Sequence, residues 1–373
     1  MYTRVAKMVG IEYPIFAFSH CRDVVAAVTN AGGCGVLGAV RKTPEELEYD
    51  LKWIEDHVSG KPYGVDVLLP SNHAGSSARG ETQPRDFPDG KEQDEFVARL
   101  LDEYDVPPMA DHLRDALWQS HVGANEHEPL IEVILKYQPK LFASALGSPS
   151  RELLDTLHEH GQVVTALAGT AEHARRHVDA GVDFVVAQGT EAGGHTGQIA
   201  TMVLVPEVVD AVAPVPVVAA GGIATGRQIA AGFALGAEGA WTGSVWLTTA
   251  EAEEDPAIKR KLMEAGSSDT VRSRSLTGKP ARMLRSAWTE AWDAPDAPPT
   301  LPLPLQRAHT AEAQFRIDRA AKDPDSGAYQ LATYFVGQVV GRMNQERPAR
   351  QVLLEMVEEY AEVLGRFLEM AAE

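Results

Sequence analysis

Residues 184–197 read Phe-Val-Val-Ala-Gln-Gly-Thr-Glu-Ala-Gly-Gly-His-Thr-Gly, a short apolar run followed by a loop with four glycines in ten residues. An uninterrupted apolar run predicts a strand that is buried on both faces, as in parallel sheets. Glycine adopts backbone conformations closed to other residues and lets the backbone approach a ligand closely. This stretch therefore predicts a buried strand that leads into a ligand-binding loop, with His195 at the centre of the loop.

The same alternation of short β-branched runs with helical patterns extends over most of the chain. Eight runs predict strands, at 13–18, 35–38, 64–69, 140–143, 162–167, 183–187, 215–219 and 239–242. Helical patterns lie between them, including 23–30, 151–160, 171–180 and 226–235. Thr43-Pro44-Glu45-Glu46 has the N-cap hydroxyl, early proline and acidic first turn of a helix start. We expect a closed (β/α)8 TIM barrel; an open doubly wound sheet is the alternative, although no Gly-x-Gly-x-x-Gly follows the first strand.

Two regions interrupt the alternation. From about 70 to 128 the chain is polar and rich in turns, with helical patterns at 94–104 and 109–119, which predicts an insertion after the third strand. We expect residues 1–250 to form the barrel and residues 251–373 to form a smaller helical lobe. Its C-terminal helix, at 347–370, carries apolar residues at helical spacing. We expect this helix to pack over the barrel mouth; packing on a neighbouring subunit, in a homodimer, is the alternative.

Composition excludes several functional classes. The chain of 373 residues has 34 Lys and Arg against 53 Asp and Glu, a formal net charge of −19. This excess disfavours binding to nucleic acids or anionic membranes, which depends on clustered Lys and Arg. Cys21 and Cys34 make neither a disulfide framework nor a zinc cluster. Because no apolar segment approaches the length of a membrane span, we expect a soluble cytoplasmic protein that acts on a small molecule.

Two further loops follow the last two predicted strands. They contain Ala219-Ala220-Gly221-Gly222 and Trp241-Thr242-Gly243-Ser244. Glycine loops at these places in a barrel, leading into helix N-termini, form its commonest phosphate site. The amides of Gly222, Gly243 and Ser244, with the Ser244 hydroxyl, would hold an anion without lysine. Together with Gln188 and His195 they predict a phosphorylated ligand across the barrel mouth. FMN fits this description, and so does a sugar phosphate, which leaves a lyase or isomerase and a non-enzymatic binder as alternatives.

Three segments resemble a known family. Residues 188–197, 216–223 and 236–247 look like the nitronate monooxygenase family, and the Gln-Gly-x-Glu-Ala-Gly-Gly-His-x-Gly motif is the most specific of them. Segments 30–38 and 269–275 support the resemblance. It implies an FMN-binding barrel with a smaller lobe over the open face of the flavin, which oxidises alkyl nitronates with O2. Relatives in that group include NAD(P)H-dependent reductases of quinones and enoyl thioesters, which gives the alternative activity on a quinone, enoyl or acyl-thioester substrate.

The resemblance also implies roles for individual residues. His195 matches the catalytic histidine, which removes the α-proton of a nitroalkane or steadies the anionic substrate. The FMN phosphate would be bound by four residues, Gly221, Gly222, Gly243 and Ser244. The rest of the flavin would be contacted by Ala17, Phe18, Asp66, Gln188, Gly193, Gly194, Trp241 and Thr242.

This chain departs from the family pattern at two places. Ala17-Phe18-Ser19-His20 stands where many members have Ala-Pro-Met, and Asp66 replaces the usual asparagine of the third strand. A carboxylate there disfavours an anionic substrate or a reduced flavin unless it is protonated or paired. His20 and His73 follow strand ends, so we name them as candidate substrate-binding residues. We expect no metal, because the His-x-His pair that metal-dependent barrel hydrolases carry on the first strand is absent.

Overall fold

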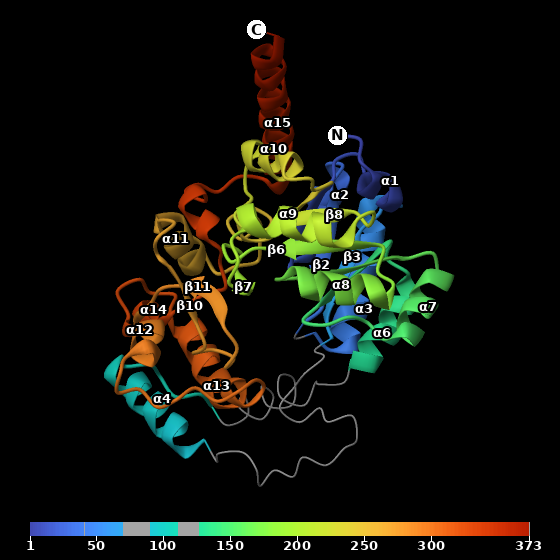
Figure 1. The fold of residues 1–373 in the computed structure, drawn as a ribbon. Coiled ribbons are helices and arrows are strands. Elements are labelled where there is room, and N and C mark those ends of the chain that lie inside the picture. The colour runs from blue at the N-terminus through green and yellow to red at the C-terminus, as the bar shows by residue number, and fades with distance from the viewer. Residues whose placement is uncertain (41, 70–89, 111–126, 373) are drawn as a thin grey trace.

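The computed structural model describes residues 1–40, 42–69, 90–110 and 127–372. Its centre is a closed parallel barrel with the strand order β1-β2-β3-β4-β5-β6-β8-β9, closed where β1 pairs with β9. Each strand overlaps its predicted run, so the TIM-barrel prediction is confirmed (Figure 1). The barrel strands are β1 (Ile15–Ser19), β2 (Cys34–Gly38), β3 (Gly64–Leu68), β4 (Leu141–Ala145), β5 (Val163–Ala168), β6 (Phe184–Gln188), β8 (Val217–Ala220) and β9 (Ala240–Thr242).

Helices that follow the strands surround the barrel. The helix start predicted at Thr43 is a complete capping box, in which the Thr43 hydroxyl accepts from the Glu46 amide and the Glu46 carboxylate accepts from the Thr43 amide. This arrangement satisfies two donors that a helix end leaves free. The helices of this part are α1 (Arg4–Val9), α2 (Arg22–Asn30), α3 (Pro44–Val58), α6 (His127–Tyr137), α7 (Arg151–Glu159), α8 (Ala171–Ala180), α9 (Thr201–Val212) and α10 (Gly226–Ala234).

The barrel has an inner and an outer apolar layer. Because side chains alternate along a strand, Val65 and Val67 of β3 point outward to the helices, and Asp66 between them points into the barrel. The inner layer contains Phe16, Val36, Leu141, Phe184 and Trp241 with their neighbours. The interior is therefore a packed apolar core, and the space for a ligand begins above it.

A second group of elements lies beside the barrel mouth. It comprises the antiparallel sheet β10-β11-β7, from β10 (Thr270–Ser273), β11 (Ala281–Leu284) and β7 (Gly194–His195), and the helices α4 (Lys91–Glu103), α11 (Pro256–Glu264), α12 (Ala287–Asp293), α13 (Leu305–Ala320) and α14 (Gly327–Leu331), with the 3-10 turns η2 (Ser244–Trp246) and η3 (Gln338–Arg342). The insertion contributes α4, which packs on α13 (Figure 1). Gln93 of α4 donates to the Pro299 carbonyl at 2.8 Å. The division of the chain near residue 250 stays a prediction, since β7 joins this sheet from the barrel side.

The last helix does not lie where the sequence led us to expect it. Helix α15 (Ala349–Ala372) packs on α10 and α2 at the outside of the barrel, so its predicted position over the mouth is wrong (Figure 1). Gly226 makes this contact close, because a Cβ there would lie 2.3 Å from the Met356 carbonyl oxygen. The last turns project beyond the barrel and expose Phe367 and Leu368.

Two sequence predictions fall outside the described residues: most of the helical pattern at 109–119, and the position of His73. No helix of the part that the structure describes combines the length and apolar character needed to cross a membrane.

Candidate functional site

A cavity of about 1500 Å³ lies at the carboxyl ends of the barrel strands, between the barrel loops and the β10-β11-β7 sheet with its helices. Ligand sites of β/α barrels occur at this end. The structure brings together at this cavity most of the residues that the sequence singled out. They are Phe18, His20, Asp66, Gln188, Gly193, Gly194, His195, Gly221, Gly222, Trp241, Gly243 and Ser244.

Two expected residues do not belong to the cavity wall. Ala17 is fully buried in the outer layer between the barrel and its helices. Thr242, its neighbour in the strand register, donates its hydroxyl to the Phe16 carbonyl at 2.9 Å. Because Phe16 and Phe18 point inward, the intervening Ala17 points outward. The expected contact of these two side chains with a ligand is therefore not supported.

The turns after β8 and β9 leave main-chain donors free. Gly221 and Gly222 both have positive φ, 95° and 72°, which other residues rarely adopt. The amides of Gly222 and Gly243 donate to no acceptor among the described residues. The Ser244 hydroxyl accepts from the Gly337 amide at 2.8 Å, so its own proton remains available for donation. These donors line one cavity, and free main-chain donors of this kind can bind an anion without a lysine; we refer to them as the cradle.

The start of α10 contributes less to this cradle than its position predicts. A carboxylate oxygen of Glu359 on α15 accepts from the Gly226 amide at 2.7 Å. The Ala224 amide donates to the side chain of Gln228 at 2.8 Å. Because these partners occupy donors at the helix N-terminus, the cradle consists chiefly of the loop amides.

The glycine-rich loop after β6 is fixed at several points. The Glu191 carboxylate accepts from the amide and hydroxyl of Thr201 at the start of α9, at 3.0 and 2.9 Å. Arg282 donates to the Thr190 carbonyl at 2.7 Å. A Cβ on Gly193 would lie 2.9 Å from the Gly337 amide nitrogen, so glycine is required where the C-terminal segment crosses the loop. The loop therefore has a fixed conformation and forms part of the cavity wall.

His195 is held by the small sheet. It pairs with Ala281 in the β7–β11 register, and its Nδ1 lies 3.3 Å from the Pro280 carbonyl oxygen. A carbonyl only accepts, so Nδ1 carries the proton of the neutral ring and Nε2 carries a lone pair. Burial lowers the pKa of His195 to about 4, and the positive charges of Lys279 and Arg307 act in the same direction. The ring is therefore neutral and basic at Nε2 near neutral pH.

Several residues of the cavity wall were not predicted from the sequence. Lys279, Arg307, Tyr334, Phe335 and Gly337 come from the C-terminal part of the chain. The ring of Phe335 lies 6.2 Å from that of His195, centroid to centroid. The resembling segment 269–275 was the available signal, since it forms β10, which pairs with β11, and β11 in turn pairs with the strand that holds His195.

Asp66 stands alone on the inner face of β3. It is 6% exposed, and its carboxyl group makes no hydrogen bond or ion pair with any described residue. Burial raises the pKa of Asp66 to about 8. A carboxyl group in this position is predominantly neutral at pH 7.

One cluster of possible metal ligands occurs among the described residues, formed by Cys21, Asp23 and Glu253. The Cys21 thiol donates to the Glu251 carbonyl, and burial raises the pKa of that thiol. A metal requires the thiolate, so this cluster is a poor site.

Comparison with known proteins agrees with the geometry. A sequence model described as "Nitronate monooxygenase" matches residues 3–359. The chain belongs to the nitronate monooxygenase family. It is 58% identical to a Mycobacterium tuberculosis protein whose name assigns it provisionally as a monooxygenase, over 98% of both chains. It is 30% identical to a Staphylococcus haemolyticus protein provisionally named a nitronate monooxygenase, over 77% of this chain and 79% of that one.

Solved structures give the same result. Nitroalkane oxidase from Streptomyces ansochromogenes superposes with a TM-score of 0.79 and 28% identity, over 97% of this chain and 99% of that one. FabK from Thermotoga maritima superposes with a TM-score of 0.74 and 26% identity, over 99% of each chain. The protein is therefore an enzyme, a flavin-dependent oxidoreductase. The lyase, isomerase and non-enzymatic alternatives are set aside.

Proposed function

We propose that this enzyme binds FMN and oxidises alkyl nitronates with O2. The observation that carries the proposal is the orientation of His195, a neutral imidazole anchored at Nδ1 that lines the same cavity as the anion cradle. Family membership supports the reaction class, and the resemblance of the His195 loop supports the role of the histidine.

The chain offers a suitable place for each part of FMN. The free amides of Gly222 and Gly243 and the Ser244 hydroxyl would hold the phosphate. Apart from its chain neighbours, a methyl group on Gly243 would have only Phe18 within 4 Å among the described residues, so there is room beside this amide. Gln188 and Gly193 line the same cavity as the cradle and His195 and would contact the ribityl chain or the ring. The bound flavin would supply the acceptor for the substrate's electrons.

The residues around His195 would prepare the substrate. With a neutral nitroalkane, Nε2 takes the α-proton, and the Pro280 carbonyl holds the ring in the required tautomer. With a preformed nitronate no proton has to be removed. The positive charges of Lys279 and Arg307 lie close enough to lower the pKa of His195, and the same field favours an anionic substrate at this end of the cavity.

Substitution of His195 tests this role. We expect His195→Asn to lower turnover of a neutral nitroalkane by about 10²- to 10⁴-fold, the usual contribution of a general base. Turnover of the preformed nitronate should fall much less. His173→Asn is the matched control, because His173 lines the same cavity without an anchored ring nitrogen in the described structure. Equal rates for wild type and His195→Asn on both substrates would remove His195 from the chemistry.

A second candidate is an NAD(P)H-dependent reductase of a quinone, enoyl or acyl-thioester substrate. The cavity volume of about 1500 Å³ supports this candidate, because typical small-molecule sites occupy about 300–1000 Å³ and the extra space would admit a larger substrate. Anaerobic mixing separates the two activities. Bleaching of the flavin by NADH or NADPH supports the reductase, whereas bleaching by an alkyl nitronate alone supports the monooxygenase.

The substrate-binding role of His20, the cytoplasmic location and the homodimer also stay predictions. His20 lies at the cavity, and its ring stacks edge-on against Phe18 with centroids 5.2 Å apart. Light scattering of the purified protein at several concentrations measures the oligomeric state.

A further inference from the structure

Asp66 is a buried acid for which the proposed chemistry has no role. It lies between Val65 and Val67, whose side chains pack outward, so its own carboxyl group points into the barrel at the base of the cavity. In the strand register it stands beside Gly38 of β2 and Ala143 of β4. Neither neighbour has a polar side chain, and the apolar inner layer lies below. The Asp66 carboxyl group is therefore buried without a neighbouring group that would stabilise its negative charge.

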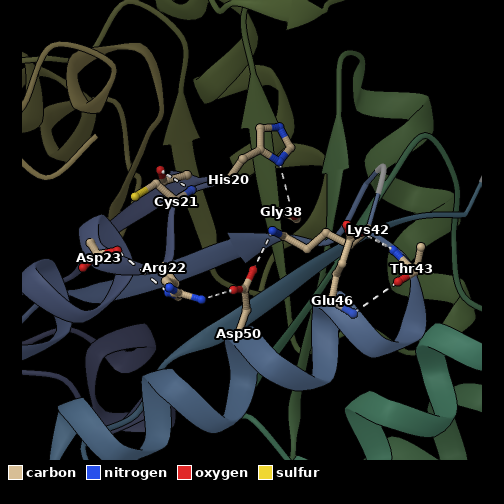
Figure 2. A network of polar contacts seen from close by, with 10 residues as sticks. His20, Cys21, Arg22, Asp23, Gly38, Lys42, Thr43, Glu46 and Asp50 are labelled. Atoms are coloured by element: carbon tan, nitrogen blue, oxygen red, sulfur yellow. Dashed lines mark hydrogen bonds and ion pairs between the residues drawn. The ribbon is translucent and has the colours of Figure 1, made fainter. Parts of the chain in front are cut away.

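The charged groups on this side of the cavity are already paired with one another. Asp50 bridges Arg22 at 2.9 Å and Lys42 at 2.6 Å (Figure 2). The Nδ1 atom of His20 lies 3.0 Å from the carbonyl oxygen of Gly38, the register partner of Asp66 (Figure 2). The titratable or charged groups that line the cavity near β1, β2 and α3 are His20, Arg22, Lys42, Glu46 and Asp50, and helix α8 adds His173, Arg176 and His177.

None of these groups forms an ion pair with Asp66 in the described structure. Only burial shifts its pKa, and no charge contributes to the shift. An ionised carboxylate in such surroundings carries a desolvation penalty that nothing offsets, whereas the neutral acid carries an O–H donor. The amide usual at this strand position also presents a donor. A protonated Asp66 therefore replaces it as a donor, and an ionised Asp66 does not.

We propose that Asp66 is a protonated positioning residue that donates a hydrogen bond to the flavin bound in this cavity, so that ionisation of its carboxyl group weakens flavin binding. This inference rests on the flavin site of the proposed function. It assigns to the enzyme a pH-dependent flavin affinity that a chain with asparagine at this position would lack.

The test is the dissociation constant of FMN, measured by fluorescence quenching between pH 6 and pH 9.5. Because binding of FMN is linked to protonation of Asp66, the wild-type constant should rise above pH 8, approaching roughly tenfold for each pH unit. Asp66→Asn should bind FMN with a constant that stays flat over this range. Glu55→Gln is the matched control, since burial also raises the pKa of Glu55 but this side chain lies outside the cavity. It should keep the wild-type pH profile.

A second measurement uses only the wild-type protein without flavin, so it does not depend on whether a variant folds. Infrared spectra of the wild-type protein should contain the carbonyl band of a buried protonated carboxylic acid at pH 7, and this band should disappear as the pH passes 8. A carboxylate at pH 7 would overturn the inference, and so would identical pH profiles of FMN binding for wild type and Asp66→Asn. If FMN binds to neither protein at any pH, both the inference and the proposed function fail. If FMN binds with a flat profile, only the inference fails.

Discussion

Replacing His195 by glutamine should make the protein less sensitive to acid. Glutamine keeps an amide donor for the Pro280 carbonyl but has no group that titrates. The wild-type imidazole is neutral in the folded protein, because burial lowers the pKa of His195 to about 4 from its ordinary 6.5. In the unfolded chain the same group takes up a proton below about pH 6.5. The unfolded state therefore binds more protons between these two values, and acid destabilises the fold through this residue.

The size of the effect follows from the two pKa values. A difference from 6.5 to about 4 corresponds to about 3 kcal/mol of unfolding free energy, at about 1.4 kcal/mol for each factor of ten in proton affinity. This contribution is complete above pH 6.5 and is lost as the pH falls towards 4. At about pH 4.5 the wild type should have lost about 2.5 kcal/mol through His195.

Urea unfolding at pH 7 and pH 4.5 measures this difference. Wild type and His195→Gln are compared in protein of the same flavin content, so that the other titrating groups cancel. We expect the unfolding free energy of the wild type to fall by about 2 to 3 kcal/mol more than that of the variant. Equal losses would mean that His195 has an ordinary pKa and is solvated. The imidazole would then be partly protonated at pH 6.5, and the assignment of a neutral base at Nε2 would fail.

Three further substitutions test the cradle and its supports. Gly243→Ala should weaken FMN binding by at least about tenfold, because its methyl group would occupy the space beside the amide that would hold the phosphate. The Tm of the flavin-free protein should stay unchanged, because that space is otherwise open. Isothermal titration and thermal unfolding measure these effects, with Gly365→Ala as control. Glu191→Gln should destabilise the fold by about 1 to 2 kcal/mol in urea, because Thr201 loses a charged acceptor. Gly226→Ala should release α15 to limited proteolysis, since its methyl group would clash with that helix, and an undisturbed α15 would contradict the packing described.

The sequence predicted the elements whose signal is local. The apolar runs at Phe184 and Val217 are buried on both faces, and burial on both faces is what a continuous apolar run encodes. Thr43 and Glu46 form their capping box within four residues of each other. The glycines at 221 and 222 have positive φ, which the residue type alone suggests.

The remaining features depend on residues far apart in the chain. His195 is anchored by Pro280 and Ala281, and no local sequence pattern predicts that pairing. The family resemblance named Ala17 by position alone, and which face of β1 its side chain takes follows from the strand register, which places it in the outer layer. The apolar stripe of α15 predicts a buried face but not the helices against which that face packs. Close packing on α10 is possible only because Gly226 has no Cβ.

The central claim is that main-chain amides after β8 and β9 hold a flavin phosphate while His195 faces the flavin ring. A crystal structure of the protein with FMN tests it most directly. We predict phosphate oxygens within hydrogen-bond distance of the amide nitrogens of Gly222 and Gly243, and the Nε2 atom of His195 open to the space above the ring. A phosphate bound elsewhere, or a His195 ring walled off from the flavin, would contradict the account.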